Sequence, residues 1–120
     1  MLSTADQTPA ANETTKVDHN ISIALKDGHA LPPNPMPELH FGQTIRYTSS
    51  AGKVRIVFPN LSPFRNDNQT MTEVRDSEVA KLVTDGTFTC RCFITLPNGE
   101  EVGWDPEHPD SGGVHKVSKP

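Results

Sequence analysis

Two cysteines, Cys90 and Cys92, are the side chains of this chain best suited to chemistry, and a single residue separates them. A Cys-x-Cys pair can present two thiolates to one soft ion such as Zn²⁺ or Cu⁺. The spacing is seldom suited to a structural disulfide, because bridged Cα atoms lie about 4.4–6.8 Å apart with converging Cβ vectors. On a strand the two residues share a face with Phe88 and Ile94, where cysteine commonly serves as a small hydrophobic core residue. We therefore predict two core thiols, with a metal-binding pair as the alternative.

The histidines that could complete such a metal site are scattered along the chain. They are His19, His29, His40, His108 and His115. None of them forms the His-x3–5-His pair typical of zinc sites, so only the fold could bring His108 or His115 to the cysteines. We predict solvated or loop histidines and no cofactor.

Other catalytic patterns are missing from the sequence. The acidic residues between positions 100 and 110 lack the Asp-x-Asp-x-Asp-Gly spacing of a calcium-binding loop. The sequence contains no Gly-x-Ser-x-Gly turn and no glycine-rich loop that could cradle a phosphate. It therefore predicts a protein that is not an enzyme.

Length and charge restrict the partners. With 120 residues the chain is long enough for one domain and too short for two independent cores. Its net charge of −4 disfavours binding to nucleic acid or to an anionic membrane, and it has no run of about 18 apolar residues that could cross a membrane. We expect a monomer whose partner, if any, is a protein. The cellular compartment stays open, because a mature exported domain could carry the same two thiols.

The chain divides into a tail and one domain. Residues 1–18 are almost free of apolar side chains and cannot offset the entropy lost on ordering, so we predict a disordered tail before a domain over residues 19–120. Within the domain, residues 31–37 carry four prolines, which remove backbone donors and hold the chain extended. We predict a connector there and not a strand of a sheet.

Alternation of apolar and polar residues with period two marks the strands of the domain. We predict strands over residues 19–25, 42–48, 53–58, 76–83, 87–96, 101–104 and 113–117, although the run 76–83 mixes residues that favour a helix with residues that favour a strand. The second and third of these runs are expected to form a hairpin, and residues 97–100 are expected to form another hairpin turn. Because no long helical pattern is present, the sequence predicts an all-β fold, an antiparallel sandwich of about seven strands.

Three segments of the chain resemble the pattern of the cupredoxin family. They are Gly42-Gln43-Thr44-Ile45-Arg46-Tyr47, Val54-Arg55-Ile56-Val57-Phe58 and Asp85-Gly86-Thr87-Phe88-Thr89-Cys90-Arg91-Cys92. The resemblance implies a Greek-key β-sandwich, with Cys92 at the position of the copper thiolate and Cys90 at that of a core aromatic residue. No His or Met follows Cys92 within residues 93–99, and no His follows Phe58 within residues 59–64. The resemblance therefore implies a member of the family that lacks the blue-copper ligand set.

These observations lead us to expect a non-catalytic binding or interaction module that uses loops at one end of the sandwich, residues 59–72 and 97–113. Phe64, Arg65 and Trp104 are the predicted contact residues, because aromatic and arginine side chains are favoured in interfaces.

Two alternative functions stay open. The first is a metal-handling protein that binds Cu or Zn through Cys90 and Cys92, with His108 or His115 as a further ligand. The second is an accessory or inhibitor domain that acts on a larger enzyme.

Overall fold

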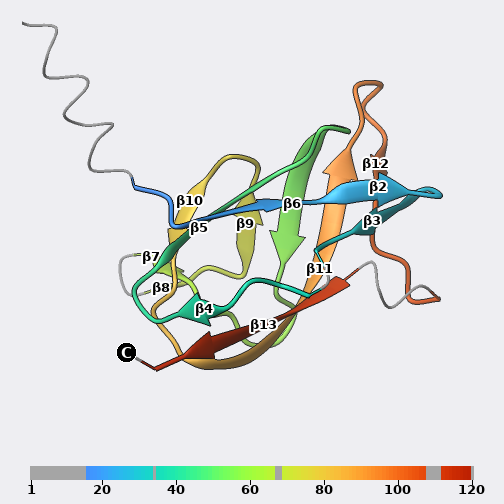
Figure 1. Ribbon diagram of the computed structural model, residues 1–120. Helices are drawn as coiled ribbons and strands as arrows, with labels where there is room; N and C mark the ends of the chain where they lie inside the picture. The colour runs from blue at the N-terminus through green and yellow to red at the C-terminus, as the bar shows by residue number, and fades with distance from the viewer. Residues whose placement is uncertain (1–15, 34, 67–68, 108–111, 120) are drawn as a thin grey trace, which may run out of the picture.

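The computed structural model describes residues 16–33, 35–66, 69–107 and 112–119, and every regular element within them is a β-strand (Figure 1). The strands are β1 (His19–Ser22), β2 (Ala24–Lys26), β3 (His29–Leu31), β4 (Leu39–His40), β5 (Thr44–Thr48), β6 (Lys53–Val57), β7 (Arg65–Asn66), β8 (Gln69–Thr70), β9 (Glu73–Arg75), β10 (Val79–Lys81), β11 (Gly86–Thr95), β12 (Glu101–Val102) and β13 (Gly112–Ser118). The predicted all-β fold is confirmed. The described residues form thirteen strands where about seven were expected, because connectors and loops contribute strands of two or three residues.

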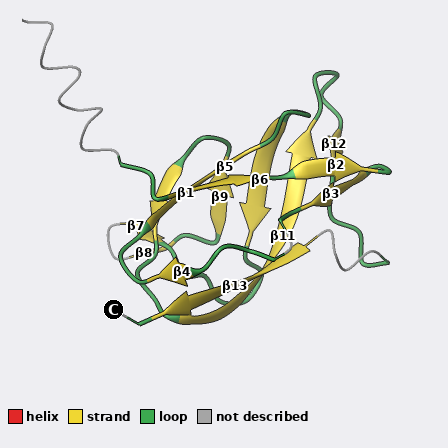
Figure 2. Cartoon of the chain, in the orientation of Figure 1, coloured by secondary structure: helices red, strands yellow, loops and turns green. Residues whose placement is uncertain are grey.

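Two sheets enclose the core (Figure 2). The larger sheet has the order β4-β13-β11-β6-β9, with β12 pairing β11 beside this path, and the smaller sheet has the order β1-β5-β10. Two pairings, β1 with β5 and β4 with β13, are parallel, so both sheets are mixed where an antiparallel sandwich was expected. Parallel neighbours need a long connection between them, and in both pairs the strands are far apart in the sequence.

The hairpin predicted from residues 42–48 and 53–58 does not form. The two runs contain β5 and β6, which lie in different sheets, so the short segment between them crosses from one sheet to the other. Both strands keep the predicted inward faces, because Ile45 and Val54 point into the same core from opposite sheets. The crossing brings Gly52 so close to β11 that a Cβ there would overlap the carbonyl oxygen of Thr95.

Other local predictions agree with the structure. The ambiguous run 76–83 contains a strand, β10, which pairs with β5. The Asp27-Gly28 turn closes the β2–β3 hairpin, and both residues have positive φ (52° and 82°), as a two-residue hairpin turn of the I′ type requires. The turn over residues 97–100 joins β11 to β12, with the Leu96 N–H donating to the Glu100 carbonyl oxygen at 2.8 Å.

The boundary of the predicted tail needs a correction. Residues 1–15 lie outside the described part of the chain, but Asp18, which the sequence placed in the tail, is bonded to β5. The Asp18 N–H donates to the Thr44 carbonyl oxygen at 3.2 Å, and Asp18 Oδ2 accepts from the Thr44 N–H at 3.0 Å. These bonds tie the chain to β5 from Asp18 onward, so the ordered domain begins before residue 19.

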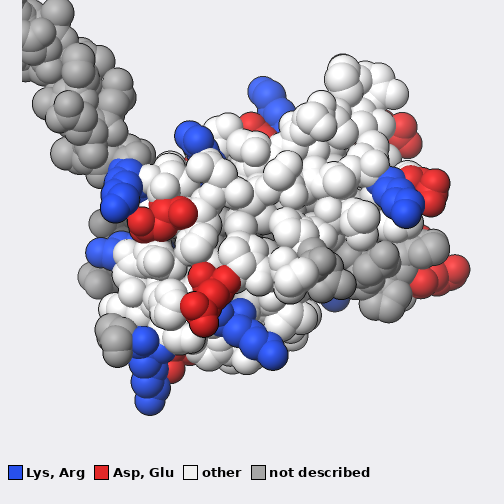
Figure 3. Space-filling view, viewed as in Figure 1, with Lys and Arg blue, Asp and Glu red and all other residues white. Residues whose placement is uncertain are grey.

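Charged groups of both signs are spread over the surface. In the face drawn in Figure 3, they stand around a mainly uncharged centre, and neither sign dominates. No helix long and apolar enough to cross a membrane occurs in the described residues.

Candidate functional site

A cavity of about 560 Å³ opens beside the first half of β13. One wall is the segment that follows β3, and its lining residues are Leu31, Pro32, Pro33 and Met36. The opposite wall combines Thr89 and Cys90 of β11, Trp104 and Pro106 after β12, and the first three residues of β13. Four segments that are distant in the sequence therefore meet at one cavity.

The cavity exists because the proline connector, residues 32–38, cannot extend the sheet. It runs beside β13 towards β4 (Figure 1), but β4 pairs only with Val117 and Ser118. The Ser118 carbonyl oxygen accepts a hydrogen bond from the Phe41 N–H at 2.9 Å, so the backbone groups of Ser118 point towards β4 and away from β11. The direction of the backbone groups alternates along a strand. Those of Val114 and Gly112 therefore point to the same edge of β13 as those of Ser118. The prolines of the connector have no N–H that could bond to the carbonyl oxygens of Val114 and Gly112. The ladder of hydrogen bonds therefore ends, and a cavity lies in its place.

Two glycines at the start of β13 shape the floor of the cavity. A Cβ on Gly112 would lie 2.5 Å from the carbonyl oxygen of Cys90, which leaves no room for a side chain. A Cβ on Gly113 would lie 3.3 Å from Cys90 Sγ, 3.6 Å from Met36 Cε and 3.7 Å from Pro32 Cγ. A side chain on Gly113 would therefore crowd the place where these three groups converge.

Trp104 forms the side of the cavity that faces the outer surface of the sheet. Its Nε1 lies 3.3 Å from the point where a Cβ of Gly112 would stand. The guanidinium of Arg91 lies 4.3 Å from the centroid of the indole ring, within the range of a cation–π contact. Trp104 is half-buried, and the Arg91 guanidinium covers one face of its ring.

A chain of buried polar groups lies behind the cavity floor. Cys90 Sγ and His115 Nδ1 are 3.9 Å apart, and His115 Nε2 lies 2.8 Å from the hydroxyl oxygen of Tyr47. Cys92 lies two residues further along the same inward face of β11, and its thiol influences the acidity of Cys90. All four side chains are at most 2% exposed, and Phe58 packs edge-on against the imidazole, with the ring centroids 5.5 Å apart.

These contacts change the acidity of the buried groups. The Cys92 hydrogen bond, helped by His115 and the Gly113 N–H and opposed by burial, lowers the pKa of Cys90 to about 5. The same hydrogen bond and burial raise the pKa of Cys92, so the pair carries at most one negative charge near neutral pH. Burial and then the neighbouring thiols raise the pKa of Tyr47 well above its ordinary value, so its hydroxyl keeps its proton.

The fold brings His115 to Cys90, as the metal-binding alternative requires, but assembles no metal site among the residues that the structure describes. His108 lies outside the described residues, and both ring nitrogens of His115 are already directed at Tyr47 and Cys90. Among the residues that can be described, no group of three or more His, Cys, Asp or Glu side chains could hold a metal ion.

The predicted contact surface is wrong at Phe64, which is fully buried. Its ring packs edge-on against Phe58 and Tyr47, with centroids 5.6 and 6.5 Å away. The loop of residues 59–72 folds back on the core, and the Phe64 carbonyl oxygen accepts from the Met71 N–H at 3.0 Å. An aromatic residue in a loop rich in Pro and Asn thus anchors the loop instead of facing solvent.

The remaining two predicted contact residues lie apart. Arg65 is exposed on β7, whereas Trp104 follows β12, and Figure 1 shows these strands at opposite ends of the molecule. The loops they belong to therefore do not share one end of the sandwich as expected. Sequence reasoning missed Met36 and Gly113, whose only signals were the proline-rich connector and the Gly-Gly pair.

Comparison with known proteins adds little to this description. No protein-family model matches the sequence, and no curated protein sequence matches it. One solved structure that matches is the McoA multicopper oxidase from the hyperthermophile Aquifex aeolicus, at 16% identity and a TM-score of 0.39. The match covers 88% of this chain, which spans 28% of the length of the oxidase. At this TM-score the likeness carries no argument about fold family, metal or activity.

Proposed function

We propose that this protein is a non-catalytic binding module whose cavity takes up an apolar ligand. The observation that carries the proposal is the cavity itself, whose volume of about 560 Å³ falls within the roughly 300–1,000 Å³ typical of ligand pockets. Its walls are mainly proline, leucine, methionine, valine and tryptophan, so ligand binding would remove apolar surface from water on both partners.

The walls of the cavity are also stiff, which favours binding. Proline rings have fixed φ angles, and the indole of Trp104 stacks against the Arg91 guanidinium. A preformed pocket loses little conformational entropy when it is filled, so more of the contact energy contributes to affinity.

The chemistry of the lining supports binding over catalysis. Among the described lining residues Cys90 is the one titratable side chain, and neither a carboxylate nor an imidazole lines the cavity beside it. General acid–base catalysis needs such a group within hydrogen-bond reach of a bound substrate.

The proposal can be tested by energy transfer from Trp104, the single tryptophan of the chain, to the neutral apolar dye N-phenylnaphthylamine. We expect saturable transfer. Val114 lines the cavity and is 47% exposed, so Val114→Lys should place a charge at its rim and weaken dye binding about tenfold, or ~1.4 kcal/mol.

The matched control is Leu61→Lys, which changes another exposed apolar residue, 69% exposed and absent from the cavity lining, and should leave dye binding unchanged. Absence of saturable transfer, or equal loss in both variants, would overturn the proposal.

A further inference from the structure

We infer that the cavity is a site of thiol–disulfide exchange, in which Cys90 forms a mixed disulfide with a small disulfide molecule. The inference rests on the proposed function, because the disulfide must enter the same cavity. It names a chemical class of ligand, the disulfides of low-molecular-weight thiols, that the apolar walls alone do not specify.

The geometry distinguishes Cys90 from its neighbour. Cys90 lines the cavity and is 2% exposed, and its sulfur lies 3.3 Å from the point where a Cβ of Gly113 would stand, whereas Cys92 does not line the cavity and is 0% exposed. An attacking sulfur needs an approach along the S–S axis of its target, and of the two cysteines Cys90 is the one that borders the cavity. A small disulfide can enter a cavity of about 560 Å³, and its thiol half can remain there.

The buried polar chain prepares Cys90 for this reaction. Tyr47 keeps its proton, and in the His115 tautomer whose Nε2 accepts from the Tyr47 hydroxyl the imidazole proton lies on Nδ1, 3.9 Å from Cys90 Sγ. The neighbouring Cys92 thiol and the Gly113 N–H also lower the pKa of Cys90. Polar hydrogens near one sulfur favour its thiolate, which is the reactive form in thiol–disulfide exchange.

The reaction balances without a further reagent. The Cys90 thiolate attacks one sulfur of R–S–S–R, a Cys90–S–S–R bond forms, the R–S–S–R bond breaks, and R–S⁻ leaves and takes up a proton from water. The added disulfide is the oxidant, and Cys90 is oxidised. Cys92 cannot readily resolve the adduct, because residues two apart on a strand are about 6.6 Å apart with parallel Cβ vectors, which suits a disulfide poorly. The mixed disulfide should therefore accumulate.

The test is intact mass spectrometry of the folded full chain after incubation with hydroxyethyl disulfide. We expect one hydroxyethylthio group per chain, removed by dithiothreitol and absent from Cys90→Ser. Arg91 lies between the two cysteines, so trypsin separates them and locates the adduct. Modification at Cys92, or modification only in urea, would overturn the inference.

The pH profile tests the role of the polar chain. With a pKa of about 5, Cys90 should react at nearly the same rate between about pH 6 and pH 8, whereas an ordinary thiol gains about 75-fold over this range. Cys92→Ala keeps the attacking thiol and removes a donor, so its rate should rise with pH. An equally steep profile in the wild-type protein would contradict this assignment.

The dye experiment separates failure of this inference from failure of the proposed function. If the folded protein binds N-phenylnaphthylamine saturably and forms no adduct, the thiol site is wrong and the binding module stands. If it neither binds the dye nor forms an adduct, both are wrong. Circular dichroism of Cys90→Ser and Cys92→Ala, matched to the wild-type spectrum, shows that each variant is folded in these comparisons.

Discussion

Side chains along β11 alternate between a buried inner face and a more exposed outer face, and the two faces carry different interactions. Phe88, Cys90, Cys92 and Ile94 point into the core, where buried polar groups contact one another. Arg91 and Phe93 lie on the outer face, where arginines stack on aromatic rings and pair with carboxylates. Polar interactions are stronger on the inner face because water is excluded there, whereas the outer charges are screened.

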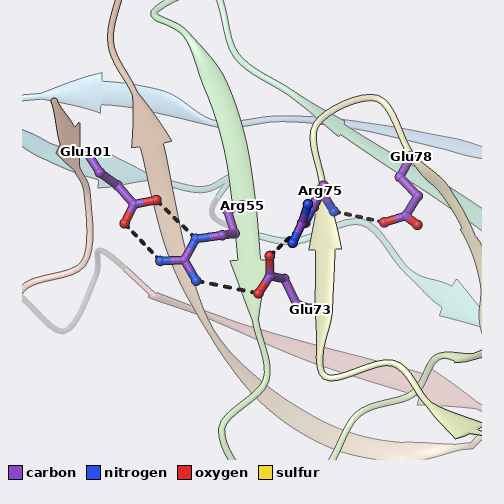
Figure 4. A network of polar contacts seen from close by, with 5 residues as sticks. All are labelled: Arg55, Glu73, Arg75, Glu78 and Glu101. Atoms are coloured by element: carbon purple, nitrogen blue, oxygen red, sulfur yellow. Dashed lines mark hydrogen bonds and ion pairs between the residues drawn. The ribbon is translucent and has the colours of Figure 1, made fainter. Parts of the chain in front are cut away.

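The outer face is held by a network centred on Arg55 (Figure 4). Its guanidinium makes two hydrogen bonds to Glu101, at 3.0 and 2.9 Å, and lies 3.6 Å from Glu73. Glu73 in turn accepts from Arg75 Nε at 3.0 Å, and Arg55 stacks over the Phe93 ring at 4.4 Å. These contacts link β12, β6 and β9 across the sheet, but they do so in partly exposed positions where ion pairs contribute little.

The largest contrast between the faces should come from packing. Ile94→Ala removes a fully buried side chain and should cost about 2–5 kcal/mol of unfolding free energy, because it leaves a cavity in the core. Thr95→Ala, the next residue on the outer face, should stay within about 0.5 kcal/mol. Urea unfolding measures both. Equal costs would show that the two faces are not distinguished by burial.

The second contrast concerns buried polar groups. Tyr47→Phe leaves a nitrogen of His115 without its partner and should cost about 1–3 kcal/mol. The double variant Tyr47→Phe with His115→Phe removes both partners and keeps rings at both positions, so it should be less destabilised than the sum of the single variants. Strict additivity in a double-mutant cycle would mean that the hydrogen bond contributes nothing.

Local pattern predicted much of this arrangement. The alternation in residues 87–96 places the right four side chains inward, and the Asn98-Gly99 pair predicts the turn at which Gly99 has a φ of 91°. Both depend on neighbours in the sequence, where sterics and period-two geometry act directly.

The pairing of the strands and the position of the cavity could not be predicted in this way. The inward face of a strand does not determine which sheet the strand joins, so β5 and β6 were predicted to form a hairpin although they lie in different sheets. The cavity needs Met36, Cys90, Trp104 and Gly113 at one place, and crossovers between sheets bring them together. The prediction of Phe64 as a contact residue was wrong for the same reason, because its loop returns to the core through contacts with residues distant in the sequence.

The smallest contrast lies in the outer network and depends on pH. The Arg55 hydrogen bonds lower the pKa of Glu101, so the stabilisation they provide is fully present above the ordinary glutamate pKa near about 4.3. It is lost as the pH falls through the lowered value and Glu101 becomes neutral. Arg55→Met should therefore cost about 0.5 kcal/mol in urea unfolding at neutral pH and low salt, and less in acid or at high salt.

The control for this last contrast is Arg75→Met. The Arg75 side chain is 80% exposed, against 34% for Arg55, and it makes one ion pair with Glu73 without the paired hydrogen bonds to Glu101. Its replacement should change the unfolding free energy less than that of Arg55, at every pH. If the cost of Arg55→Met persisted undiminished below the pH at which Glu101 is protonated, the outer face would owe its stability to stacking on Phe93, and burial of that ring would matter more than charge.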